Sequence, residues 1–190
     1  MQSVAPNLTE REGGPENVLS QAKAGDPLAF EAIVQEQAAM VFSLAYRFLR
    51  SRAHAEDLAQ DVFLALHQHL SQMQSPAHLV HWLRKVTSHR CIDATRSFRY
   101  RLERLVGRVP ELTIVGKDAD PLLAELLHRI VGELAARPRM VMTLRYQEDL
   151  DVQEIAALLD VPVNTVKSDL RRSLDVLRRK LAKYGYHDET

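Results

Sequence analysis

Apolar residues along this chain return every three or four positions, which is the spacing of one face of an α-helix. The period-two alternation that marks a half-buried strand is not seen, so the pattern predicts an all-α protein. Residues 27–49 are predicted to form one long amphipathic helix or two shorter ones, with Asp26 as the N-cap and Pro27 as the first helical residue. The further predicted helices cover residues 55–70, 77–101, 121–135, 137–146, 152–159 and 162–184.

Glycine and proline divide these helices into two small helical domains. Residues 1–24 are polar and contain a Gly-Gly-Pro run, so they are predicted to be a flexible tail. Residues 102–120 are interrupted by glycine and proline, and they are predicted to be a flexible linker. The two domains are then residues 25–101 and 121–190, each long enough for a small core.

Composition places the chain among soluble globular proteins, with 46% hydrophobic and 26% charged residues. No apolar run approaches the roughly 20 residues of a membrane span, and the N-terminus lacks the apolar core of a secretion signal. The single cysteine, Cys91, excludes an intrachain disulfide and fits a reducing compartment. We therefore expect a cytoplasmic protein without membrane insertion.

The formal net charge of zero conceals two basic segments. Residues 81–104 hold seven basic and two acidic residues, and residues 163–184 hold the same numbers. The rest of the chain has 11 basic and 21 acidic residues. A polyanion such as DNA therefore remains a possible partner at two places along the chain.

Residues 152–159, the short connection Asp160-Val161 and the helix that follows have the dimensions of a helix-turn-helix. An apolar row predicted to be buried consists of Val166, Leu170, Leu174, Leu177 and Leu181. Hydroxyl and cationic side chains that suit base edges and phosphates lie outside that row, at Thr165, Lys167, Ser168, Arg171 and Arg172. The alternative is a solvated basic face of a bundle helix. Asp169 weakens the DNA interpretation unless it pairs with a cation such as Arg172.

The helix predicted at residues 77–101 has two faces. Its core face carries Leu79, Trp82, Leu83 and Val86, so Trp82 is interpreted as a core residue and not as a platform for stacking bases. The opposite, basic face carries Lys85, Ser88, Ile92, Arg96 and Arg99.

Several classes of chemistry find no support in the residue spacing. Histidines cluster between His67 and His89, but none has the spacing of a zinc or metalloprotease motif. Glycine-rich phosphate loops and nucleophile–base pairs with recognisable spacing are also not found. We therefore expect no catalytic residues, no metal site and no cofactor.

Two long segments together resemble a known family. The segment FEAIVQEQAAMVFSLAYRFLRSRAHAEDLAQDVFLALHQHL with HWLRKVTSHRCIDATR resembles region 2 of extracytoplasmic-function (ECF, group 4) sigma factors. The segment LAARPRMVMTLRYQEDLDVQEIAALLDVPVNTVKSDLRRSLDVLRRKL is similar to their region 4. The resemblance implies a region 2 helical bundle and a region 4 helix-turn-helix on a flexible linker.

In function, the resemblance implies a bacterial initiation factor that binds core RNA polymerase and directs it to the −10 and −35 elements of promoter DNA. The implied polymerase contacts are the clamp coiled coil of the beta-prime subunit and the beta flap, and an anti-sigma factor is a further expected partner. The residues that match the clamp-binding helix are Asp57, Gln60, Asp61 and Phe63. Those matching the −10 helix are Lys85, Ser88, His89, Arg96 and Arg99, and residues 73–78 match the loop that captures a flipped base. Those matching the −35 recognition helix are Thr165, Lys167, Ser168, Arg171 and Arg172.

The chain departs from the family pattern at four positions. Asp160 and Asn164 stand where glycine is frequent, Asp169 where a basic residue is common, and His89 where asparagine is common. These departures bear on the promoter sequence more than on the fold. Two other hypotheses stay open, a stand-alone helix-turn-helix regulator and a sigma-mimicking adaptor that sequesters an anti-sigma factor.

Overall fold

The computed structural model describes residues 14–96, 121–184 and 186, and these residues contain no β-strand, so the all-α prediction is confirmed. The chain divides into two compact units, residues 1–91 (unit 1) and residues 92–190 (unit 2). The predicted linker, residues 102–120, lies outside the described residues. The predicted domain boundaries therefore stay predictions.

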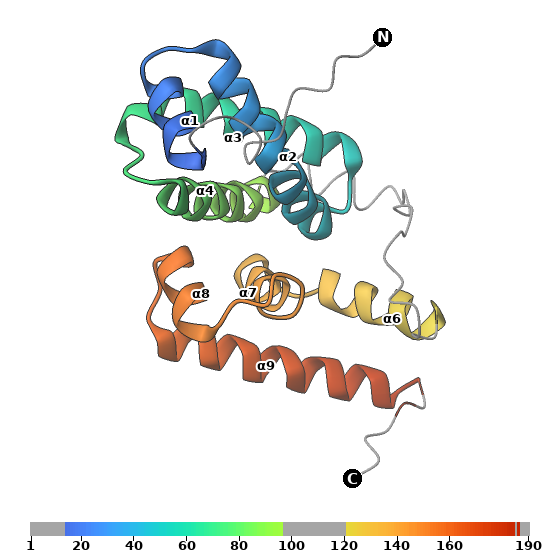
Figure 1. The fold of residues 1–190 in the computed structure, drawn as a ribbon. Helices are drawn as coiled ribbons and strands as arrows, with labels where there is room; N and C mark the ends of the chain where they lie inside the picture. Colours follow the sequence, from blue (N-terminus) through green and yellow to red (C-terminus); the bar gives the residue numbers. More distant parts are fainter. Residues whose placement is uncertain (1–13, 97–120, 185, 187–190) are drawn as a thin grey trace. The chain divides into compact units, whose positions relative to one another are not determined.

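Unit 1 is a bundle of helices joined by short turns (Figure 1). Its elements are α1 (Gly14–Lys23), α2 (Pro27–Leu49), α3 (Arg52–His69), the short 3-10 helix η2 (Leu70–Gln72) and most of α4 (Pro76–Arg96), whose last five residues fall in unit 2. The helix start predicted at Asp26 is confirmed, because its carboxylate accepts a hydrogen bond from the Leu28 N–H at 2.9 Å. Helix α3 starts three residues earlier than predicted, since Ser51 acts as its N-cap and accepts from the His54 N–H.

The prediction of a flexible tail over residues 1–24 is wrong for residues 14–23, which form α1. Pro15 stands in the first turn of this helix, where its missing N–H costs nothing, and Gly14 adopts a positive φ of 70° just before it. Val18, Leu19 and Ala22 are buried on one side, and α1 packs against α2. The Gly-Pro pair thus marks a helix start and not a loose segment.

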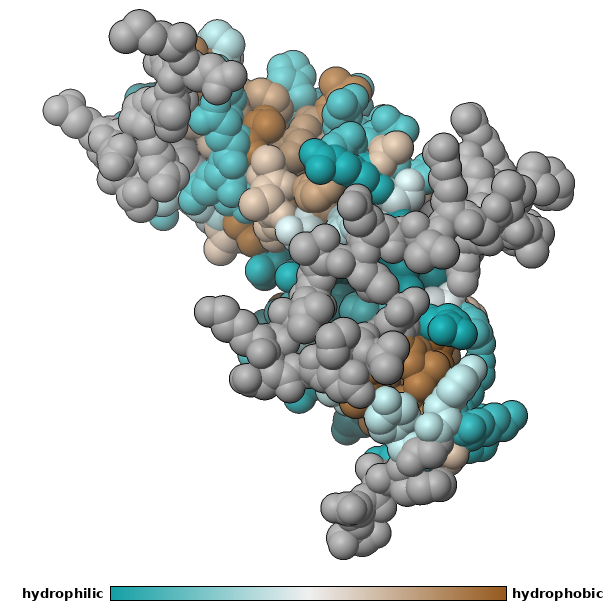
Figure 2. Space-filling view, turned by 90° about the vertical axis from the view of Figure 1, so that its right-hand side faces the viewer, coloured by the Kyte–Doolittle hydropathy of each residue, from teal (hydrophilic) through white to brown (hydrophobic). Residues whose placement is uncertain are grey.

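Helix α2 supplies the largest share of the unit 1 core. Its buried residues include Val41, Leu44 and Phe48, and α2 packs against α3, whose buried residues include Val62 and Leu66. By length and apolar composition α2 resembles a membrane span, although core helices of globular domains meet the same criteria. It packs against α1 and α3, and Figure 2 shows hydrophilic residues bordering the apolar ones on the visible face of unit 1. These contacts are those of a core helix.

Unit 2 contains α6 (Pro121–Gly132), α7 (Ala136–Tyr146), α8 (Val152–Leu159) and α9 (Val163–Ala182), which confirms the four predicted helices. Its core joins α6, α7 and α9 through Leu126, Ile130, Met142 and Leu177. The predicted apolar row of α9 is confirmed in part. Val166 is fully buried, while Leu170, Leu174 and Leu181 pack half-buried against the same core.

Local signals define the helix-turn-helix of unit 2. Asp151 and Glu154 form a capping box at the start of α8, each accepting a backbone N–H of the other, at 2.8 and 2.7 Å. Asp160 ends α8 with φ 54°, the left-handed conformation expected for the residue that replaces glycine. Helix α9 begins three residues later, at Val163.

Candidate nucleic-acid and protein-contact surfaces

The solvent-facing side of α9 carries the residues predicted to meet DNA, here called the α9 cationic face: Thr165, Lys167, Ser168, Arg171 and Arg172. The two arginines and Lys167 are exposed, and the two hydroxyl residues are half-exposed. Neither arginine forms an ion pair with any residue that the structure describes. Because α9 buries its opposite side against α6 and α7, these cations are held on a rigid support and remain available to an external anion.

Asp169 does not join the α9 cationic face. It is 2% exposed and accepts a hydrogen bond from Arg137 Nε of α7 at 2.8 Å. The predicted partner, Arg172, is exposed, and Asp169 pairs with Arg137 instead, so the predicted pairing is corrected. The hydrogen bond to Asp169, together with its negative charge, raises the pKa of Arg137. Asp169, which stands where the family commonly has a basic residue, therefore adds no carboxylate to the surface. Its ion pair with Arg137 instead links α9 to α7.

On α4 the structure corrects the position of Ser88. The side chain is 0% exposed, and its hydroxyl has no hydrogen-bond partner among the described residues. Burial on α4 extends beyond the predicted core face, because Thr87, Ser88 and Cys91 are all 0% exposed. Ser88 therefore cannot present its hydroxyl to DNA without a local change.

The other residues of the predicted basic face are less enclosed. Lys85 and His89 are half-buried, so part of each side chain reaches the surface. Arg96 ends α4, but its side chain and all of Arg99 lie outside the described residues. Trp82, interpreted as a core residue, is half-buried, and its ring centroid lies 5.7 Å from that of His69.

The predicted loop at residues 73–78 consists of a connection, residues 73–75, and the first residues of α4, so the prediction of a loop is corrected for residues 76–78. This segment is held by hydrogen bonds on both sides. Met73 is buried, and its carbonyl accepts a hydrogen bond from Lys23 Nζ of α1 at 2.9 Å. At the other end the Ser75 Oγ accepts from the His78 N–H at 3.1 Å, as an N-cap does. The side chain of Gln74, between these two ends, is exposed.

A second candidate surface lies on the exposed side of α3, here called the α3 contact face: Asp57, Gln60, Asp61 and Leu64. The Asp61 carboxylate lies 3.4 Å from Arg90 Nη1 of α4, which fixes part of this face against the bundle. Phe63, predicted as a contact, is half-buried at the flank. Leu64, which sequence reasoning did not select, is 64% exposed among the polar residues. Its i+3 and i+7 spacing from Asp61 and Asp57 was the available signal.

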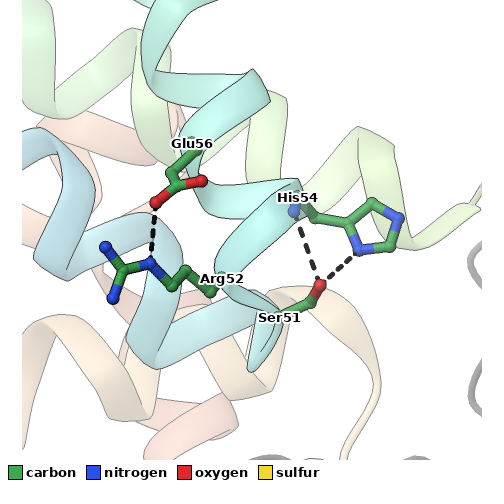
Figure 3. A network of polar contacts seen from close by, with 4 residues as sticks. All are labelled: Ser51, Arg52, His54 and Glu56. Atoms are coloured by element: carbon green, nitrogen blue, oxygen red, sulfur yellow. Dashed lines mark hydrogen bonds and ion pairs between the residues drawn. The ribbon is translucent and has the colours of Figure 1, made fainter.

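The first turn of α3 carries a separate polar network (Figure 3). The Ser51 hydroxyl lies 2.7 Å from His54 Nδ1, and Arg52 Nε donates to Glu56 at 2.8 Å. That hydrogen bond, with the charge of Glu56, raises the pKa of Arg52. Both members of this ion pair are largely exposed, so the network serves the helix start and is not a ligand site. Within the described residues, no three His, Cys, Asp or Glu side chains are placed to hold a metal ion.

Comparisons with known proteins cover both units. Residues 33–100 match the family described as Sigma-70 region 2, and residues 124–177 match Sigma-70, region 4. The ECF RNA polymerase sigma factor SigW of Bacillus subtilis is 28% identical over 176 residues, which are 86% of this chain and 94% of SigW. SigE of Mycolicibacterium smegmatis, another ECF sigma factor, is 30% identical over 168 residues, 83% of this chain and 63% of SigE.

A solved structure has the same fold. CnrH, in complex with the cytosolic domain of CnrY, aligns with a TM-score of 0.63 and 23% identity over 89% of this chain and 97% of CnrH. The two sigma-70 regions occur in this chain in the order of the two units described above. The chain therefore belongs to the sigma-70 family, as an ECF sigma factor, and is a transcription initiation factor.

Proposed function

We propose that this sigma factor binds core RNA polymerase and directs it to promoters by contacting a −10 element with unit 1 and a −35 element with unit 2. The observation that carries the proposal is the α9 cationic face, whose arginines are exposed and form no ion pair among the described residues. It stands on the second helix of a helix-turn-helix, the helix that enters the major groove in such motifs.

The −35 contact divides between two kinds of side chain on α9. Thr165 and Ser168 are half-exposed near the start of the helix, where short hydroxyl groups can reach base edges. Lys167, Arg171 and Arg172 are exposed and can neutralise phosphates. Because Asp169 is turned inward and neutralised by Arg137, it does not repel the DNA backbone.

The −10 contact is proposed to use Lys85 and His89 of α4 together with the loop at residues 73–78, which captures an unstacked base. The exposed Gln74 side chain supports this role, since an amide can both donate and accept hydrogen bonds at a base edge. Arg96 and Arg99 remain proposed contacts from outside the described side chains. Ser88 is not part of this site, because it is buried.

The α3 contact face is proposed to bind the clamp coiled coil of the beta-prime subunit, while unit 2 binds the beta flap. Leu64 is 64% exposed beside these polar residues, so a partner that covers this face would remove its apolar side chain from water. Leu64 would add buried apolar area to the contacts of Asp57, Gln60 and Asp61.

We further propose an anti-sigma factor as a partner, a cytoplasmic location and no catalytic activity. The sigma factor RpoE of Bartonella quintana, whose solved structure has the same fold with a TM-score of 0.61, is in complex with the anti-sigma factor NepR, which supports this partner. A stand-alone helix-turn-helix regulator would need no α3 contact face, and a sigma-mimicking adaptor would bind its partner without directing transcription.

Run-off transcription with purified core polymerase tests the proposal. Templates come from mapping transcript starts after overexpression of the protein. A defined start that depends on the added protein supports promoter-directed initiation, and its absence on every mapped template refutes it. A stand-alone regulator would instead bind the same DNA without polymerase.

The clamp contact has its own test in the Asp61→Asn variant, compared with Glu56→Gln on the same helix. Glu56 lies outside the α3 contact face and pairs with Arg52, so its substitution is a matched control. We expect Asp61→Asn to weaken binding to core polymerase about 5- to 30-fold, as for an interface charge whose removal costs about 1–2 kcal/mol. Equal affinities of the two variants would refute the assignment of Asp61.

A further inference from the structure

The loop at residues 73–78 is held by side chains from two helices that sequence reasoning did not connect with it. Lys23, at the end of α1, donates to the Met73 carbonyl across a separation of 50 residues. His78, in the first turn of α4, accepts a hydrogen bond from the Gln74 backbone N–H at its Nδ1, 3.2 Å away. The backbone on both sides of the Met73–Gln74 peptide bond is therefore held by a side chain.

Lys23 makes the stronger of these two contacts. An ammonium group bound to a carbonyl oxygen forms a charge-assisted hydrogen bond, which is roughly twice as strong as a neutral one. The buried Met73 side chain holds the same residue from inside, and α1 packs against η2 just before it. The carbonyl and the side chain of Met73 are thus both fixed.

His78 constrains the loop through a hydrogen bond at its ring Nδ1. A backbone N–H can only donate, so the Nδ1 atom that faces Gln74 must accept and carry no proton. The backbone N–H of His78 itself donates to Ser75 Oγ, so one residue ties together Gln74 and Ser75.

We infer that Lys23 and His78 are positioning residues that hold the loop at residues 73–78 in one preformed shape, with the Gln74 side chain directed outward for an unstacked nucleotide. The inference rests on the proposed nucleotide-capture role of this loop. A preformed loop has less conformational entropy to lose when a base is bound, so base selection is stronger. The N-terminal helix α1 thereby becomes part of the −10 recognition site without touching DNA.

The test uses holoenzyme and forked promoter DNA whose non-template −10 strand carries an abasic site at one position at a time. The variants are Lys23→Met, which keeps the length of the side chain but removes the ammonium, and His78→Phe, which removes the acceptor. Lys23→Arg and His78→Asn are the conservative counterparts, because each retains the donor or acceptor. Gln21→Met is the matched control, because Gln21 is an exposed polar residue of α1 whose side chain forms no hydrogen bond with the described residues of the loop.

For the wild type we expect one position at which removal of the base weakens binding roughly 5- to 150-fold, the range for a stacked or pocketed base. Lys23→Met and His78→Phe should reduce this penalty to less than about threefold. The conservative variants and Gln21→Met should retain it. The salt dependence of binding should not change, because a positioning residue releases no counterion.

Three results would overturn the inference. If Lys23→Met and His78→Phe both keep the full penalty of the wild type, the loop does not depend on these side chains. If Lys23→Met keeps the penalty and lowers the salt slope by about 0.7, Lys23 is a phosphate contact on single-stranded DNA and not a positioning residue. If the wild type shows no sensitive position, the capture role itself fails, and the inference fails with it.

Discussion

The ion pair between Asp169 of α9 and Arg137 of α7 predicts an unequal response of unit 2 to removal of each partner. Asp169 is 2% exposed, whereas Arg137 is 48% exposed. Loss of the arginine leaves a carboxylate enclosed without a cation, while loss of the aspartate leaves a guanidinium that water can still hydrate. Substitution of Arg137 should therefore lower the free energy of unfolding more than substitution of Asp169.

The magnitudes follow from the burial of each partner. Breaking a fully buried pair costs about 3–5 kcal/mol, and an exposed pair contributes about 0.2–1 kcal/mol. We expect Arg137→Ala to lower the free energy of unfolding of unit 2 by about 2–4 kcal/mol and Asp169→Ala by about 1 kcal/mol. The double variant should be more stable than Arg137→Ala alone, because it contains no enclosed charge.

Urea unfolding of the whole chain measures these differences. Trp82, the one tryptophan of the sequence, lies in unit 1, so its fluorescence reports on that unit and serves as an internal control. Far-ultraviolet circular dichroism reports on the helices of both units. A smaller loss for Arg137→Ala than for Asp169→Ala, or additive losses in the double variant, would refute the reasoning.

Three further predictions concern other parts of the chain. Arg171→Ala and Arg172→Ala should each lower the salt slope of binding to duplex −35 DNA by about 0.9. Arg178→Ala, which removes the ion pair with Asp175, serves as the comparison variant. Unchanged slopes for Arg171→Ala and Arg172→Ala would argue against phosphate contacts. Asp149 adopts a left-handed backbone conformation with φ 54°. In thermal unfolding, Asp149→Val should lower the free energy of unfolding by about 1–2 kcal/mol and Asp149→Gly by less than about 0.5 kcal/mol. Equal effects of the two substitutions would exclude backbone strain as the cause. Ser88→Ala removes a buried hydroxyl that has no hydrogen-bond partner among the described residues. The substitution should raise the free energy of unfolding by about 0.5–1 kcal/mol and leave promoter affinity unchanged. Weaker promoter binding would contradict the burial of Ser88.

Much of the fold was predictable because its signals are local. The start of the helix at Pro27–Leu49 was predicted to the residue from Asp26 and Pro27, whereas the apolar pattern left open one long helix or two shorter ones, and the structure has one. The helix-turn-helix followed from two periodic segments and a short connection, and Asp160 adopts the left-handed conformation expected of it. The arginines of the α9 cationic face were identified in the same way, by their place outside the apolar row.

Local patterns were insufficient where a side chain's surroundings come from a distant segment. Periodicity placed Ser88 on the basic face, but packing around α4 buries it. It also suggested Arg172 as a partner for Asp169, although the nearest cation comes from α7, 32 residues away. Helix α1 was missed because a ten-residue helix is marginal in isolation and is stabilised by packing against α2.

Helix positions, caps and the overall charge pattern were thus encoded in neighbouring residues, because backbone hydrogen bonds and capping contacts span about four positions. The tertiary fold decided which charged groups turn inward, which apolar residue stays exposed on α3 and which lysine holds the loop before α4. These outcomes depend on burial and on contacts across as many as 50 residues, such as the hydrogen bond from Lys23 to Met73. The sequence pattern does not give the spatial distance between residues that are far apart along the chain.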